Sequence, residues 1–246
     1  MRVRINIEYD GTKYVGWQKQ KNGKSIQGEI EACLLKLYKE EIKLFVAGRT
    51  DSGVHAIEQV AHFDTNNKIE AKRIYLALNF LLNESSNDIS ILTSEEASLE
   101  FHSRFSAKKR TYLYKILNRR SPSPIYSNRV YWIPYELDEV LMREAASYLI
   151  GCHDFNSFRS SDCQSEKSIR SLETINIRRI KDQILIQISA KSFLHNQVRI
   201  IVGTLINIGR KYWKKEKMLE ILNYKNRIYA GPTAPAEGLY LQKIHY

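Results

Sequence analysis

Strands with alternating apolar and polar residues, separated by stretches with helical spacing, recur along the chain and restrict its fold more than any other feature. In the first nine residues, Val3, Ile5 and Ile7 alternate with polar or charged side chains, which predicts a half-buried strand. Apolar residues at helical spacing from Ile26 to Leu37 predict a helix, for which Ser25 is a suitable N-cap. The rest of the first half predicts strands at 42–46, 59–64, 89–92 and 98–103 and a helix through 74–81.

The second half repeats this mixture of elements. It predicts strands at 109–117, 172–180, 184–190 and 239–245, helices at 138–150, 198–208 and 214–222, and loops at 118–127 and 153–168. Gly151 is expected to end the first of these helices. Because each half combines strands and helices in an order suited to antiparallel pairing, we expect an α+β protein of two similar α/β lobes sharing a central antiparallel sheet. The boundary is placed after residue 105, which gives domains 1–105 and 106–246.

The charge of the chain is concentrated in the second of these domains. The whole chain has 38 Lys and Arg against 27 Asp and Glu, a net charge of +11. Residues 1–105 hold 14 basic and 15 acidic side chains, whereas residues 106–246 hold 24 and 12. A one-sided basic excess suits a partner rich in phosphate, so nucleic acid is the leading candidate partner. The same charge can also serve solubility alone.

Composition and motifs exclude several classes of protein. No run approaches the roughly 18 apolar residues that a membrane span needs, and the N-terminus lacks the apolar block of a signal peptide, so a cytoplasmic chain is expected. Cys33, Cys152 and Cys163 are too few and too far apart for a disulfide framework or a zinc site. The six histidines form no ligand set, and we assign no metal. Neither a dinucleotide fingerprint nor a phosphate loop with its lysine is present.

One polar loop is a candidate for chemistry. AGRTDSGVHA, residues 47–56, leaves a predicted strand and contains two glycines that permit tight backbone geometry. Arg49 stands two residues before Asp51, so the loop can present a carboxylate beside a guanidinium, as a nucleophile or an anchored ion requires. Spacing alone favours an ordinary Asp-Ser-Gly turn instead.

Two further segments are ambiguous in the same way. Arg199 interrupts an otherwise apolar helix, where it can pair with Asp51 or a phosphate, or extend its charge to the surface. Tyr112 and Tyr114 share one face of a predicted strand beside a run of basic residues, which suits a stacked base. Tyrosines on strands are also frequent in protein cores.

Six segments, taken together, resemble the TruA-type tRNA pseudouridine synthases. They are YDGTKYVGWQKQ (9–20), AGRTDSGVHA (47–56), FHSRFSAKKRTYLY (101–114), DFNSFR (154–159), FLHNQVRIIVG (193–203) and APAEGLYL (234–241), in family order over almost the whole chain. AGRTDSGVHA is the most specific of them. Ser52 stands where many members have Ala, and Asn196-Gln197 replaces the commoner His-Met, but neither change removes a reacting group.

The resemblance implies an isomerase that converts uridine to pseudouridine at positions 38, 39 and 40 of the tRNA anticodon stem-loop. It implies a basic cleft between the lobes, a homodimer that binds tRNA across both subunits, and no metal or organic cofactor. It also implies that Asp51 is the nucleophile, that Tyr112 packs against the target base, and that Arg49 and Arg199 support the carboxylate.

Two other functions fit parts of the sequence. A non-catalytic RNA-binding protein needs the same basic charge but makes no use of Asp51. A metal-dependent nuclease using Asp51 and Asp64 requires a cluster of carboxylates around Mg²⁺. We rank both below the synthase.

Overall fold

The computed structural model describes residues 1–67 and 69–246. They form two compact units: unit 1 comprises Met1–Lys108 and Tyr240–Tyr246, and unit 2 comprises Lys109–Leu239. The division at residue 108 lies close to the expected boundary at 105. The last seven residues differ from the expectation, because they return to unit 1 rather than staying with the second domain.

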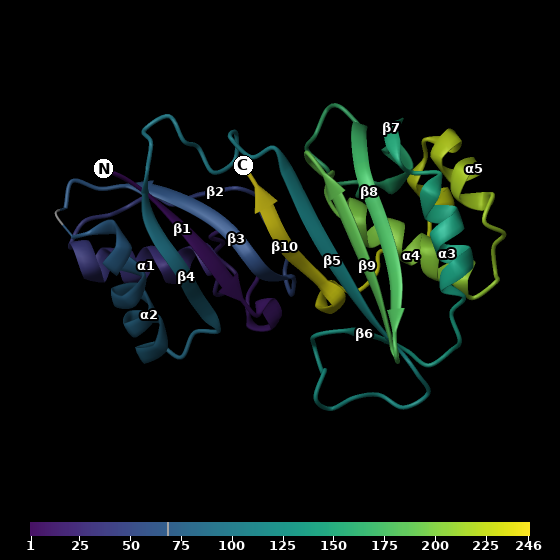
Figure 1. Ribbon diagram of the computed structural model, residues 1–246, viewed down its shortest axis with the longest axis horizontal. Coiled ribbons are helices and arrows are strands. Elements are labelled where there is room, and N and C mark those ends of the chain that lie inside the picture. Colours follow the sequence, from purple (N-terminus) through teal and green to yellow (C-terminus); the bar gives the residue numbers. More distant parts are fainter. Residues whose placement is uncertain (68) are drawn as a thin grey trace. The chain divides into compact units, whose positions relative to one another are not determined.

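Unit 1 is a sheet with the strand order β4-β1-β3-β10, and β2 pairs with β3. Its strands are β1 (Arg2–Tyr9), β2 (Phe45–Val46), β3 (His55–Asp64), β4 (Ile89–Ala97) and β10 (Leu239–His245). The helices α1 (Ile26–Tyr38) and α2 (Ile74–Glu84) lie side by side against this sheet (Figure 1). β10 runs parallel to β3, so the expectation of a wholly antiparallel sheet is wrong at this pairing.

Unit 2 has the strand order β5-β9-β8-β7, and β6 pairs in parallel with β5. Its strands are β5 (Lys109–Asn118), β6 (Tyr131–Ile133), β7 (Gly151–Asp154), β8 (Ile169–Ile180) and β9 (Gln183–Ala190). Its helices are α3 (Glu139–Ser147), α4 (Gln197–Gly209) and α5 (Lys217–Tyr224), grouped against the sheet of this unit (Figure 1). Eleven of the thirteen residues of α4 are buried, so α4 forms the centre of the core of unit 2.

Periodicity and capping explain most of these elements. In β1 the alternate residues Val3, Ile5, Ile7 and Tyr9 are buried, as the sequence pattern predicts. The Ser25 hydroxyl accepts a hydrogen bond from the Gly28 amide at 3.2 Å and caps α1, which confirms the expected start of the helix. Both units are therefore mixed α and β, and the expected α+β class is confirmed.

The predicted boundaries fail at three places where local turns and a positive φ replace the expected elements. The strand expected at 98–103 is instead a turn in which the Phe101 amide donates to the Ser98 carbonyl at 2.9 Å. Gly151 does not end a helix but begins β7 with φ +105°. The long loop expected at 153–168 contains the end of β7 and a turn of 3-10 helix at Asn156–Phe158.

Candidate active site

Asp51 lies in unit 1 on the loop between β2 and β3, and its side chain is half-buried. The Val54 amide donates to the Asp51 carbonyl at 3.1 Å, and Gly53, with φ +76°, closes the turn. The turn that the spacing favoured is thus confirmed. A turn of this kind presents a carboxylate at the end of a strand without placing it inside the core.

Three hydrogen bonds hold this loop on the side preceding Asp51, one through the Thr50 side chain and two through backbone carbonyls. The Tyr9 hydroxyl and the Thr50 hydroxyl are 2.7 Å apart, and the Trp17 amide donates to the Thr50 carbonyl at 3.0 Å. The Gln59 side-chain amide donates to the Gly48 carbonyl at 2.7 Å. Burial raises the pKa of Tyr9 to about 12, so its hydroxyl remains protonated at physiological pH.

The segment 9–17 approaches the same loop too closely for side chains at its glycines. Gly16 has φ +109°, and a Cβ there would lie 2.8 Å from the Thr50 carbonyl oxygen. A Cβ on Gly11 would overlap the Val54 carbonyl oxygen. The two motifs at 9–20 and 47–56, far apart in the sequence, therefore form one packed structure around Asp51.

Sequence reasoning did not identify Tyr9 and Gln59 as supports of the loop. Gln59 has no exposed surface, although it is polar and lies within a strand. A polar side chain at a buried strand position needs a hydrogen-bond partner. A glutamine at the start of a predicted strand was therefore the feature of the sequence that could have indicated a support for a neighbouring loop.

Arg49 is exposed on the same loop. Within the described ranges 1–67 and 69–246, it makes no hydrogen bond or ion pair. Its guanidinium is thus free to meet a group outside the chain.

Tyr112 and Tyr114 differ in their surroundings in unit 2. Tyr114 is fully buried, its hydroxyl donates to the Pro235 carbonyl at 2.7 Å, and burial raises its pKa well above 10. Tyr112 is half-buried, opposite Ile188 on β9, and its ring meets the Phe193 ring edge-on with centroids 5.2 Å apart. The core interpretation is confirmed for Tyr114, whereas Tyr112 retains an accessible part.

Arg199 is one of the two residues of α4 that are not buried. Its Nε donates to the Ala234 carbonyl at 2.7 Å, and its Nη1 donates to Asn196 Oδ1 at 2.9 Å. The Arg199 guanidinium therefore lies beside the segment that also receives the Tyr114 hydroxyl, and its charge opposes the rise in the pKa of Tyr114. The motifs at 193–203 and 234–241 meet at this point in unit 2.

Asp64 is a poor candidate for a metal ligand. Both of its carboxylate oxygens accept hydrogen bonds from Arg2, each at 2.8 Å, and Arg2 holds the pKa of Asp64 below its usual value. Among the residues the structure describes, no group of three or more His, Cys, Asp and Glu side chains is arranged to hold a metal ion. In the same residues, no helix has the length and apolar character needed to cross a membrane.

Comparisons with known proteins identify the same family as the motifs that meet in each unit. A family described as tRNA pseudouridine synthase matches residues 5–106 and 145–246. The chain belongs to this family, whose members are isomerases. Its relatives include proteins named tRNA pseudouridine synthase A from Anaplasma marginale (strain Florida), 48% identical over 100% of both chains, and from Sinorhizobium medicae (strain WSM419), 45% identical over 100% of this chain and 99% of the relative. The protein of that name from Anaplasma phagocytophilum (strain HZ) is 48% identical over 100% of both chains.

Proposed function

We propose that this tRNA pseudouridine synthase isomerises uridines 38, 39 and 40 in the anticodon stem-loop of tRNA, with Asp51 as the nucleophile. The observation that carries the proposal is the position of Asp51 on a loop held by Tyr9, Trp17 and Gln59. Preorganised loops of this kind keep a reacting group within reach of its target with little reorganisation.

The reaction is an isomerisation, so the substrate and the product contain the same atoms. The N1–C1′ bond of uridine breaks, the freed uracil rotates, and a C5–C1′ bond forms. The hydrogen on C5 is lost to a base, and N1 gains a proton. The Asp51 carboxylate can attack C1′ or C6 of the base, or assist formation of a glycal, and in each case it is released at the end.

The other residues have supporting roles in the proposal. A duplex stem hides its bases, so the target must leave the stack at a cost of a few kcal/mol. Stacking on the accessible part of Tyr112 returns about 1–3 kcal/mol of that cost. Arg49 and Arg199 supply positive charge for Asp51 or for a phosphate.

The arrangement of the whole enzyme also belongs to the proposal. We expect the two units to share a central sheet, with a basic cleft between them, and two copies of the chain to bind tRNA as a homodimer. The family match covers segments of both units, which supports one enzyme built from the two, while the cleft and the homodimer rest on the resemblance of the six motifs.

The test compares the wild type with Asp51→Asn, which keeps the size of the side chain and removes its charge. Unmodified tRNA transcripts with uridine at 38, 39 or 40 are incubated in EDTA, and pseudouridine is mapped by carbodiimide and reverse-transcription stops. We expect stops with the wild type only. Asp162→Asn, at an exposed aspartate of unit 2, is the matched control and should remain active.

Each outcome separates the alternatives. Retained activity in Asp51→Asn would overturn the role of Asp51. RNA cleavage in a parallel incubation with Mg²⁺ in place of EDTA, without cleavage in EDTA, would indicate the nuclease. Tight tRNA binding by the wild type without any product would indicate an RNA-binding protein.

A further inference from the structure

Unit 2 contains a pocket of about 770 Å³ to which the proposed reaction assigns no role. It lies between the end of β5, the segment 134–140 and the end of α4. The pocket is lined by five basic side chains and three acidic ones, and the basic ones are Arg119, Arg120, Arg179, Arg210 and Lys211.

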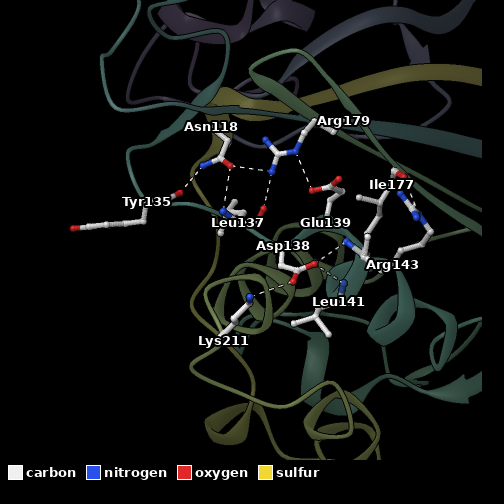
Figure 2. A network of polar contacts seen from close by, with 11 residues as sticks. Asn118, Tyr135, Leu137, Asp138, Glu139, Leu141, Arg143, Ile177, Arg179 and Lys211 are labelled. Atoms are coloured by element: carbon white, nitrogen blue, oxygen red, sulfur yellow. Dashed lines mark hydrogen bonds and ion pairs between the residues drawn. The ribbon is translucent and has the colours of Figure 1, made fainter.

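The floor of the pocket is fixed by a network around Arg179 on β8 (Figure 2). Arg179 donates to the Glu139 carboxylate at 2.9 Å, to Asn118 Oδ1 at 3.1 Å and to the Leu137 carbonyl at 2.6 Å. The Asn118 amide in turn donates to the carbonyls of Ile133 and Tyr135, at 3.1 and 2.5 Å. The backbone on both sides of Tyr135 is thus tied to the sheet.

This network holds the Tyr135 backbone but leaves its ring outside. Figure 2 shows the Tyr135 ring directed away from the polar contacts, and 58% of the residue is exposed. The Arg210 guanidinium lies 4.4 Å from the centroid of this ring and 4.3 Å from that of Tyr212. Arg210 also donates to the Tyr212 hydroxyl at 2.7 Å, and Tyr212 is 66% exposed.

Two exposed tyrosines with an arginine over both rings form a stacking platform, defined here as Tyr135, Arg210 and Tyr212. Exposed aromatic rings beside guanidinium groups are the features on which unpaired nucleobases stack. Arg210 contacts both rings within the chain itself, and a platform arranged before binding loses less entropy when a ligand stacks on it.

Positive charge surrounds the platform. Arg120 is exposed and, in the part of the chain the structure describes, has no hydrogen bond or ion pair. Lys211 reaches Asp138 only at 3.5 Å, and its side chain is 70% exposed. Two of the three acidic residues at the pocket are already engaged, since Asp138 caps α3 and Glu139 binds Arg179, whereas the third, Glu136, is exposed beside Tyr135. A phosphate near the platform thus meets cations that have unused hydrogen-bond donors.

The platform is remote from Tyr112 and Arg199. Asn118 is six residues beyond Tyr112 along β5, which corresponds to about 20 Å. Arg210 is eleven residues beyond Arg199 along and just past α4, which corresponds to about 16 Å. A nucleotide on the platform cannot be the uridine that stacks on Tyr112.

We propose that this pocket is a second RNA-binding site, where an unpaired nucleobase of the substrate stacks on the platform and a neighbouring phosphate contacts Arg120 or Lys211. The inference rests on RNA as the substrate but not on the chemistry of Asp51. The site contributes to the affinity for RNA and leaves the isomerisation step unchanged.

The test measures the Kd for unmodified tRNA and the kcat at saturating tRNA in four variants. Tyr135→Ala and Arg210→Ala should each weaken binding by about five-fold or more with kcat unchanged, because a stacking contact is lost. Tyr135→Phe keeps the ring and should bind like the wild type. Lys36→Ala removes an exposed charge from α1 and is the control for charge alone.

The outcomes distinguish this inference from the proposed function. Wild-type affinity in Tyr135→Ala overturns the second site even where pseudouridine forms normally. Equal weakening by Tyr135→Phe and Tyr135→Ala also overturns it, because the ring face would then play no part. Weak binding by Tyr135→Ala together with an inactive wild type supports the site and rejects the proposed chemistry. Should Arg210→Ala fail to fold, the exposed Tyr135 variants still decide the matter.

Discussion

Gly16 shows how one residue constrains the candidate site. Its backbone has φ +109°, and a Cβ there would lie only 2.8 Å from the carbonyl oxygen of Thr50, one residue before Asp51. An alanine there suffers both backbone strain and a steric overlap, which only a shift of the loop relieves.

We predict that Gly16→Ala lowers the free energy of unfolding by more than about 2 kcal/mol and reduces kcat. Gly151→Ala is the matched control, because Gly151 has φ +105° but only a contact at 3.5 Å. It should cost about 1 kcal/mol and leave kcat unchanged. Urea unfolding and the rate of pseudouridine formation measure both effects, and equal losses in the two variants would refute the role of close approach.

At the residue scale, the sequence could not separate residues of like chemistry. Tyr112 and Tyr114 share a strand face, yet only Tyr114 is sealed by the segment that supplies Pro235. Asp51 as nucleophile came from the resemblance, because the spacing of its loop is that of an ordinary turn. Its role stays a prediction until the variant is measured.

Among the elements, β3 and the turn after β4 are joined by a buried histidine. His62 on β3 is 1% exposed, and its Nδ1 accepts the Ser103 amide at 3.2 Å. Burial, with the nearby charges of His102 and Arg2, lowers the pKa of His62 to about 4. Burial also lowers the pKa of His102.

This pKa predicts a loss of stability in acid. The unfolded chain protonates His62 near pH 6.5 and the folded chain only near pH 4, so the unfolded state binds the proton first. The contribution of neutral His62 is therefore complete above pH 6.5 and is lost as the pH falls to about 4, by up to about 3 kcal/mol.

Urea unfolding of the wild type and His62→Asn between pH 4 and pH 7 tests this. Asparagine keeps a short hydrogen-bond acceptor near the position of Nδ1 but does not titrate. The wild type should lose more stability than the variant over this range. Parallel curves for the two proteins would show that His62 does not titrate in this way.

The helices and strands themselves were largely predictable. Most elements appear where the sequence pattern placed them, because a buried face leaves a regular spacing of apolar residues. They include α1, α2, β1, β5, the β8–β9 hairpin and β10. The strand predicted at 98–103 fails because Ser103 uses its amide and hydroxyl to bond His62 and Phe45. Such bonds leave no periodic signal in the sequence.

For the whole molecule, charge is unevenly divided between the units. Residues 109–239 hold 22 Lys and Arg against 12 Asp and Glu, a net charge of +10 of the total +11. Unit 2 therefore carries the positive charge that binding to the phosphates of a nucleic acid requires.

We predict that binding of tRNA weakens steeply with salt. The logarithm of the association constant should fall with the logarithm of salt concentration with a slope of about −3 or steeper, since each neutralised phosphate releases counterions. Filter binding between 50 and 300 mM NaCl measures the slope. A nearly flat dependence would mean that the charge of unit 2 does not contact the RNA backbone.

The sequence by itself determined the α+β class, the segments that form most elements, the asymmetry of charge and the motifs of the family. These features depend on residues that are close together in the sequence, such as the spacing of apolar residues and the identity of a helix cap, so they can be read from the sequence alone. The tertiary structure decided that β10 returns to unit 1, that the segment 9–17 supports the loop of Asp51, and that Tyr135, Arg210 and Tyr212 form a platform. These contacts join residues far apart in the chain, and only the packing of whole elements brings them together.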